Sequence, residues 1–373
     1  MIFGPIYIGV TVYINPAGPL IAARNNNYRN EEHDMKFSYH LKGAGIAVLA
    51  VAALATAQSP AMAAGKDYIL NTASTGGTYH PVGTAISTLS KIKLLPKEKF
   101  SLTAVNSAGS GANIQAMGAN TAQFAILQGL FGSYAATGTG PVSAPQKNVR
   151  SITMLWQNVE QFVINNKYVK SGTASDMVAL KGMSMGMGKK NSGTIGSNMV
   201  LLKGLGIDIE KDYKLVDAGF GPTVDAMANG QAVGGGLGAG PPTGAVTKLM
   251  ASNSGKFTIL SVTEKERKMM DGGRNLWVPY TIKAGTYPGQ TKDVVTIAQP
   301  NFLAVNADVS EEHVYKLTKA IFENLPFLQA IHKATKAMNV GEAMAGLPVP
   351  LHPGAAKYYK EVGLTIPDHL MPR

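Results

Sequence analysis

Loops rich in glycine, serine and threonine recur along the sequence, and each follows a segment with the pattern of a β-strand. Glycine lets the backbone approach a bound molecule closely, and serine and threonine hydroxyls can donate hydrogen bonds. Where such a loop leads into a helix, the free amides and partial positive charge of the helix N-terminus favour an anion. The loops span residues 74–81, 106–111, 128–129, 188–196, 219–222 and 238–242.

Each loop taken singly has an ordinary structural explanation, because the same residue types are common in turns and at helix starts. Six such loops after predicted strands favour a ligand cleft, since ligands of open α/β sheets bind beyond the carboxyl ends of the strands. Lys189 and Lys190 precede Ser192-Gly193-Thr194 at a predicted helix start and add positive charge. The expected ligand is therefore a small carboxylate.

Common motifs of catalysis and metal binding are missing from the sequence. The segment 188–196 resembles a phosphate-binding loop, but its two lysines precede the second glycine instead of following it. The sequence has no H-E-x-x-H and no cysteine. We expect neither an enzyme nor a resident cofactor or metal.

Four further side chains allow a prediction of their surroundings. Tyr79 follows Gly76-Gly77 at the start of a predicted helix, and we expect it to face the ligand rather than the core. For His80 the sequence leaves both positions open, inside the cleft or outside it. Phe131 and Trp156 are expected in the core.

Strand and helix patterns alternate twice, which predicts an α/β fold with two lobes. The predicted strands are 68–72, 100–105, 123–127, 151–157, 161–165, 183–187, 214–216, 232–237 and 294–305. The predicted helices are 81–89, 113–117, 194–205, 222–228, one that opens with a capping box at Thr263, and one capped by Ser310.

Composition is that of a globular protein of about two domains. The chain has 373 residues, of which 45% are hydrophobic and 15% charged. Its net charge of +11 is dispersed. A nucleic-acid-binding protein usually gathers its basic residues, with aromatic residues between them, on one element. We therefore expect no nucleic acid partner.

Residues 35–63 have the pattern of a cleaved signal peptide. Lys36 and Lys42 are basic, 44–57 is apolar, and 61–63 reads Ala-Met-Ala before the expected mature start at Ala64. The sequence therefore predicts a secreted, periplasmic protein. Residues 1–34 are interpreted as a gene-model extension. The alternative is a membrane anchor over 2–23, which its prolines and glycines disfavour.

These loops, together with several longer segments, resemble the TAXI family of substrate-binding proteins, which serve tripartite ATP-independent periplasmic (TRAP) transporters. The similar segments are GGTYHPVG (76–83), SAGSGAN (107–113), AQFAILQ (122–128), NSGT (191–194), PYTIKAGTYPGQ (279–290) and GLPVPLHPG (346–354), the last followed by Tyr358-Tyr359. The first and the last two are the most specific.

The resemblance implies a periplasmic binding protein of type II, with two α/β lobes joined by crossing strands. Such a protein closes on its ligand and delivers it to a membrane partner driven by an ion gradient. Known ligands of the family include glutamate, glutamine and 2-oxoglutarate. Carried onto this sequence, the ligand contacts are Thr75, Gly77, Thr78, Tyr79, Ser107, Ser110, Gln128, Ser192, Gly193 and Thr194.

Four departures from the family pattern leave the identity of the ligand open. His80 stands where the family usually has a second tyrosine, and Ala122-Gln123 replaces the usual Ala-Asp. The lead 188–190 contains two lysines instead of a Gly-Pro-Pro-like sequence, and 234–236 consists only of glycine.

The expected organisation places the first part of lobe 1 at 64–160, lobe 2 at 161–290, and a return strand with C-terminal helices on lobe 1 at 291–373. The function that the resemblance implies is capture of a small carboxylate, such as 2-oxoglutarate or glutamate, for the membrane subunit of a TRAP transporter. The alternatives are a ligand-sensing module for a membrane signalling protein and a periplasmic enzyme on the same fold.

Overall fold

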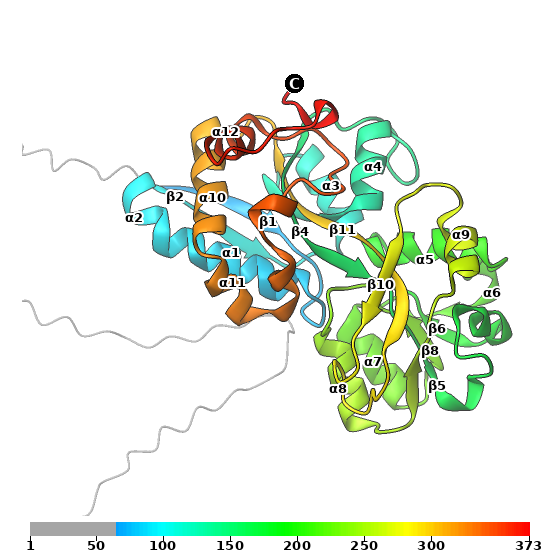
Figure 1. Cartoon of the computed structure of the whole chain (residues 1–373). Coiled ribbons are helices and arrows are strands. Elements are labelled where there is room, and N and C mark those ends of the chain that lie inside the picture. The colour runs from blue at the N-terminus through cyan, green and yellow to red at the C-terminus, as the bar shows by residue number, and fades with distance from the viewer. Residues whose placement is uncertain (1–64) are drawn as a thin grey trace, which may run out of the picture. The chain divides into compact units, whose positions relative to one another are not determined.

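Two β-sheets organise residues 65–373, the part of the chain that this computed structural model describes (Figure 1). The predicted signal peptide and the segment before it lie outside these residues. The first sheet has the order β10-β11-β3-β1-β2, with β4 also paired to β11. Its strands are β1 (Lys66–Asn71), β2 (Phe100–Val105), β3 (Phe124–Gln128), β4 (Val149–Val159), β10 (Val278–Ile282) and β11 (Val294–Asn306).

The second sheet repeats the plan of the first. Its order is β7-β6-β8-β5-β9, with β5 (Phe162–Asn165), β6 (Ser184–Gly186), β7 (Lys214–Leu215), β8 (Gly234–Gly236) and β9 (Phe257–Ile259). In the first sheet β1 pairs in parallel with β2 and β3, and in the second sheet β6 pairs in parallel with β7 and β8. A further strand pairs antiparallel with the last of each set, β11 with β3 and β5 with β8. The predicted α/β class with two lobes is confirmed.

Helices cover both sheets (Figure 1). Lobe 1 carries α1 (Tyr79–Lys93), α2 (Leu95–Glu98), α3 (Ser110–Gly118), α4 (Gly129–Thr137), α10 (Glu311–Glu323), α11 (Leu325–Ile331) and α12 (Pro353–Glu361). Lobe 2 carries α5 (Gly193–Gly204), α6 (Ile209–Asp212), α7 (Phe220–Ala228), α8 (Gly244–Ser252) and α9 (Glu264–Asp271). The predicted capping box at Thr263 and cap at Ser310 are both present. Among residues 65–373, no helix is long and apolar enough to span a bilayer.

One asparagine in each lobe ties a helix to two strands. Asn113 Nδ2 of α3 donates to Thr72 O (2.9 Å) and Ile126 O (3.0 Å), just after β1 and within β3. Asn198 Nδ2 of α5 donates in the same way to carbonyl oxygens beside β6 and in β8, at 3.0 and 3.1 Å. These bonds hold each helix start at the carboxyl ends of its strands, where the loops that favour an anion lie.

The strand β8 consists only of glycine because its neighbours pack too closely for side chains. A Cβ atom on Gly236 would lie 2.5 Å from the side-chain amide of Asn198, and one on Gly235 would lie 2.8 Å from Gly186 O. The backbone of β8 is therefore close to both a neighbouring strand and the helix above it. Residues 234–236, which the sequence marks as unusual, form a buried central strand of lobe 2.

The chain crosses between the lobes along two adjacent strands. β4 leads into β5 through Glu160-Gln161, and β11 runs antiparallel beside this crossing. Glu160 N donates to Ile297 O (2.8 Å), and Thr296 Oγ1 donates to Glu160 O (2.7 Å). The two crossings are thus hydrogen-bonded to each other and form one connection.

Two of the longer sequence motifs support this framework. In 279–290, Tyr287 OH donates to Gln161 Oε1 in the crossing and accepts from Thr243 N (2.9 Å) before α8. In 346–354, the carbonyls of Val349 and Pro350 each accept from Ser151 of β4 at 2.9 Å. These segments fasten the crossing strands and the C-terminal helices.

Gly235→Ala should destabilise the protein by about 1–3 kcal/mol, because the new methyl group meets a backbone oxygen that cannot move away. The matched control is Gly221→Ala in α7, where an added Cβ meets no atom within 4 Å. Urea denaturation at equilibrium measures both changes. Equal stability of the two variants would show that close packing does not explain the glycine strand.

Candidate functional site

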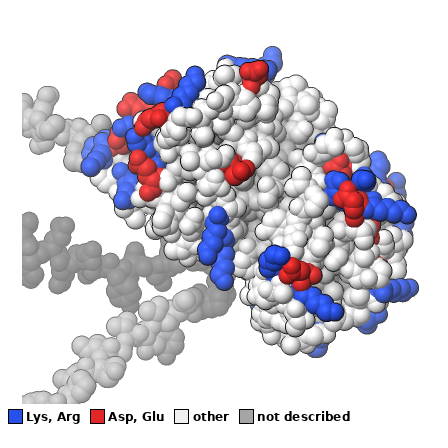
Figure 2. Space-filling view, viewed as in Figure 1, with Lys and Arg blue, Asp and Glu red and all other residues white. Residues whose placement is uncertain are grey.

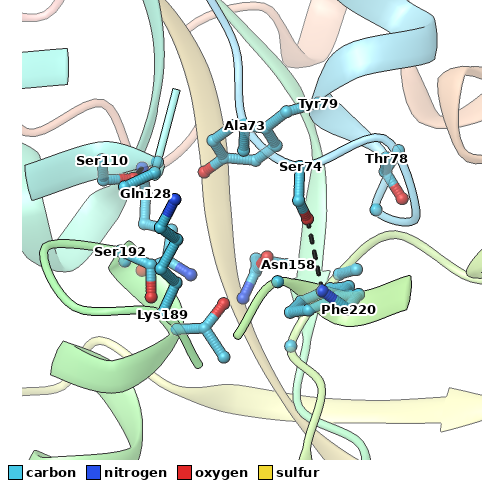
Figure 3. Close-up of a pocket in the computed structure, with 18 residues that line it drawn as sticks. Ala73, Ser74, Thr78, Tyr79, Ser110, Gln128, Asn158, Lys189, Ser192 and Phe220 are labelled. Atoms are coloured by element: carbon cyan, nitrogen blue, oxygen red, sulfur yellow. Dashed lines mark hydrogen bonds between the residues drawn. The ribbon is translucent and has the colours of Figure 1, made fainter. Parts of the chain in front are cut away.

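A cavity lies between the two lobes, at the loops that follow the parallel strands (Figure 3). Its free volume is about 40 Å³, room for only a few water molecules, so a larger ligand can enter only when the lobes move apart. Its lining residues are Ala73, Ser74, Gly77, Thr78, Tyr79, Ala108, Gly109, Ser110, Gln128, Asn158, Lys189, Ser192, Gly193, Thr194, Gly219, Phe220, Gly238 and Ala239.

Eight of the ten residues predicted to contact a ligand line this cavity: Gly77, Thr78, Tyr79, Ser110, Gln128, Ser192, Gly193 and Thr194. The structure places the other two elsewhere. Thr75 is exposed outside the cavity. Ser107 Oγ lies 2.6 Å from Asn113 Oδ1 and accepts from Gly109 N (2.9 Å), so this hydroxyl shapes the loop before α3.

Four helices begin at the cavity, two from each lobe. They are α1, α3, α5 and α7, whose first residues Tyr79, Ser110, Gly193 and Phe220 all line it. The amides in the first turn of a helix have no partner within that helix, and they carry the positive end of its dipole. At α5, Ser192 Oγ accepts from Ile195 N (3.1 Å). The geometry therefore favours a negative group in the cavity.

Lys189 is the one charged residue among those that line the cavity. Figure 3 shows it on the lobe 2 side of the cavity, next to Ser192 and directly below Gln128 and Ser110 of lobe 1. Its loop is shaped by Gly188, with a φ of +102°, and by the bond from Ser192 N to Lys189 O (2.9 Å). The cavity thus contains a cation, whereas no carboxylate is among its lining residues.

The neighbouring Lys190 belongs to a different surface. Its amide donates to Asp217 Oδ1 (2.6 Å), and the residue lines a separate groove that also contains Phe131 and Met199. The sequence pattern predicts the same role for both lysines. The structure brings only Lys189 to the cavity, because the turn at 188–192 directs the two residues to opposite sides.

Tyr79 lines the cavity, while its hydroxyl anchors it to the framework. Tyr79 OH donates to Asn301 Oδ1 of β11 (2.6 Å), and burial raises the pKa of this phenol far above its usual value. His80 does not line the cavity. Its Nδ1 lies 3.2 Å from Thr72 Oγ1. Phe131 and Trp156 are buried, as predicted.

The lobes meet on one rim of the cavity through main-chain oxygens. Ala245 N of α8 donates to Gly76 O (3.0 Å), and Thr78 Oγ1 donates to Gly240 O (2.8 Å). Ser74 Oγ lies 3.5 Å from the amide that opens α7, a contact that Figure 3 marks.

A second set of contacts joins the lobes on the opposite rim. Ala112 N of α3 donates to Asn191 O (3.0 Å), and Ser197 Oγ donates to Gln128 Oε1 (3.2 Å). Gly193 fits here because a Cβ atom would lie 2.5 Å from Gln128 Oε1. The first turn of α5 therefore rests directly on lobe 1.

Sequence reasoning missed several lining residues. Ser74 and Phe220 lie inside the predicted loops, but no motif singles them out. Asn158 lies at the centre of the cavity in Figure 3, near the end of the crossing strand β4. Nothing in the sequence marks it, because a polar residue at the end of an apolar strand is common.

Glu160 is a buried carboxyl group just behind Asn158. Trp277 Nε1 donates to its Oε1 (3.2 Å), and Asn158 Nδ2 lies 3.5 Å from the same oxygen. Burial raises the pKa of Glu160 to about 7, although hydrogen bonds from Trp277, Gln299 and Asn158 oppose the rise. The carboxyl therefore titrates near neutral pH.

The lining as a whole offers hydroxyls, amides, helix N-termini and one ammonium group. Within residues 65–373, no group of three or more His, Asp or Glu side chains is placed to hold a metal ion. Figure 2 shows basic and acidic side chains scattered over both lobes of the face drawn, with mostly uncharged surface between the lobes. The arrangement is suited to holding a small anion.

Comparison with known families agrees with this architecture. Residues 70–363 match the NMT1-like family over most of the chain. The chain belongs to the NMT1-like family. This family is of the periplasmic-binding-protein type, the same type as the two-lobed fold with crossing strands described above.

Solved structures similar to this chain include the following three. MatC from Rhodopseudomonas palustris with bound malate is 15% identical, with a TM-score of 0.49, covering 79% of this chain and 97% of that one. PhnD1 from Prochlorococcus marinus with methylphosphonate is 13% identical, with a TM-score of 0.47 and coverage of 73% and 90%. The periplasmic aliphatic sulphonate binding protein SsuA from Escherichia coli is 9% identical, with a TM-score of 0.41 and coverage of 79% and 78%.

The titration of Glu160 should make stability depend on pH. Because its folded pKa of about 7 exceeds the ordinary 4.5, folding favours the protonated form, and stability falls as pH rises from 4.5 to 7. The loss should amount to about 3 kcal/mol. Glu160→Gln should therefore be more stable than wild type at pH 8, with a smaller difference at pH 5. Urea denaturation at both pH values measures this.

The control for this test is Glu312→Gln, which removes the same charge from an exposed position of α10. It should show no comparable change between pH 5 and pH 8. A Glu160→Gln variant whose stability relative to wild type is the same at both pH values would contradict the raised pKa.

Proposed function

We propose that this chain is a periplasmic solute receptor that captures a small carboxylate between its lobes and delivers it to the membrane subunit of a TRAP transporter. The observation that carries this proposal is the set of four helix N-termini and one lysine around an interlobe cavity whose lining contains no carboxylate. Membership of the NMT1-like family supports the receptor role. The resemblance to the TAXI family supports the finer assignment.

The physical basis is the cost of placing an anion away from water. Each helix N-terminus contributes about 0.3–1 kcal/mol towards an anion, and more when the site is partly buried. Lys189 adds a full charge. Because the helices come from both lobes, an anion in the cavity interacts with both and draws them together. A ligand with two carboxylates, such as 2-oxoglutarate or glutamate, can engage α5 and Lys189 with one and α1 and α3 with the other.

The proposed ligand contacts are the eight lining residues that the family resemblance names: Gly77, Thr78, Tyr79, Ser110, Gln128, Ser192, Gly193 and Thr194. We add Lys189 and Asn158 to this set on the basis of geometry. Closure of the lobes completes the site, since the contacts on each rim join one lobe to the other. The connection through Glu160-Gln161 and β11 is the proposed hinge.

The residues that line the cavity also favour binding of a ligand over catalysis. The hydroxyls of Ser110, Ser192 and Thr194 have no histidine or carboxylate among the lining residues to act as a general base. The family is of the periplasmic-binding-protein type, which also favours a receptor. We propose that the N-terminal segment, outside the described residues, directs the protein to the periplasm.

The proposal can be tested with a thermal-shift panel on protein comprising residues 64–373. The panel contains 2-oxoglutarate, glutamate, malate, succinate, glutamine, methylphosphonate and an alkanesulphonate. We expect the dicarboxylates to raise the melting temperature most, and NMR of the released ligand to show it unchanged. Binding of none of the carboxylates would refute the proposal, and conversion of a bound compound would favour the enzyme alternative.

Lys189→Ala should weaken carboxylate binding several-fold and reduce its salt dependence, because it removes the charge at the cavity. Lys190→Ala is the matched control, since it removes the same charge from the next residue, outside the cavity. Isothermal titration calorimetry at two salt concentrations measures the dissociation constant of each variant. Equal effects of the two substitutions would show that only the general surface charge matters.

A further inference from the structure

The carboxyl group of Glu160 contacts residues that form the cavity wall. Two of its neighbours, Asn158 and Gly238, themselves line the cavity. Asn158 Nδ2 lies 3.5 Å from Oε1, and a Cβ atom on Gly238 would lie 2.5 Å from Oε2. An anion held in the cavity is therefore close to the carboxyl group of Glu160, which lies on the other side of the cavity wall.

Among the described neighbours of the Glu160 carboxyl, none is positively charged. β4 contributes Asn158, β11 contributes Gln299, the segment before β10 contributes Trp277, and the loop after β8 contributes Gly238. The titratable group that faces it from α1 is Tyr79, whose phenol stays neutral. Lys189, on the lobe 2 side of the cavity, is the nearest charge that the lining supplies.

We propose that Glu160 is a proton-uptake site coupled to anion capture, so that a carboxylate binds best when Glu160 is protonated. This inference rests on the proposed function, because it requires an anionic ligand. It adds a regulatory residue that does not touch the ligand and acts through the cavity wall.

Two physical effects give the coupling its direction. First, an ionised Glu160 repels a carboxylate across a low-dielectric wall, so the bound ligand and the proton favour each other. Second, a proton on Glu160 weakens its role as an acceptor and frees Asn158 Nδ2 to donate towards the ligand. Because burial already raises the pKa of Glu160 to about 7, the coupling acts around neutral pH, and affinity should fall as pH rises.

Glu160 also occupies the connection between the lobes, which links its protonation to closure. Its backbone accepts from Thr296 Oγ1 and donates to Ile297 O, so the residue moves with the crossing strands. Opening that lets water reach the carboxyl would favour its ionised form. The closed, liganded form and the protonated carboxyl therefore stabilise each other.

The test is calorimetric titration of 2-oxoglutarate at pH 6, 7 and 8.5 into wild type, Glu160→Gln and Glu312→Gln. A coupling of one pKa unit lowers wild-type affinity by roughly tenfold over this range. Glu160→Gln should bind with nearly constant affinity, close to that of wild type at pH 6. Glu312→Gln should follow wild type.

A second measurement needs no variant. Titrations of wild type at pH 7 in buffers of different ionisation enthalpy give the number of protons exchanged, and we expect a fraction of a proton to be taken up with each ligand. Release of a proton, or no exchange, would overturn the coupling. So would a Glu160→Gln protein with the wild-type pH dependence.

Failure of the coupling is distinguishable from failure of the proposed function. If wild type and Glu160→Gln bind 2-oxoglutarate with the same pH dependence, the receptor assignment stands and only the coupling is wrong. If neither protein binds any carboxylate of the panel at any pH, the proposed function is wrong and the coupling falls with it.

Discussion

The meeting of helix N-termini at one cavity depends on the strand order that both sheets share. In lobe 1, β2 and β3 run parallel to β1, and in lobe 2, β7 and β8 run parallel to β6. The carboxyl ends of these strands, and the loops that follow them, therefore lie on the same edge of each sheet. Asn113 and Asn198 then bind α3 and α5 to these strand ends. The crossing strands orient the two edges towards each other. Electrostatic preference for an anion is thus a property of backbone placement before any side chain contributes.

Sequence patterns predict the strands and loops of this fold well, because both depend on local chemistry. Alternation of apolar runs with helical segments locates β2 at Phe100–Val105 and places β11 within one residue of its observed end. The strands β9 and β10 were both missed, and β10 has only one fully buried residue among five. Its pairing with β11 is a long-range contact that no local pattern reveals.

The site was predictable to the level of its loops and less so to the level of single residues. Glycine and hydroxyl residues at strand ends indicate a ligand cleft, and the family resemblance names eight of the residues that line the cavity. Asn158 and Glu160 could not be found this way, because their importance comes from the crossing of two strands far apart in sequence. The different positions of Lys189 and Lys190 likewise depend on one turn, in which Asn191 has a φ of +63°.

The contacts on the two rims have a kinetic consequence. With about 40 Å³ of free volume, the cavity in this arrangement has no room for a metabolite. Exchange requires the bonds at Gly76, Gly240 and Asn191 to break together. The residence time of a bound molecule is then governed by how often the lobes separate.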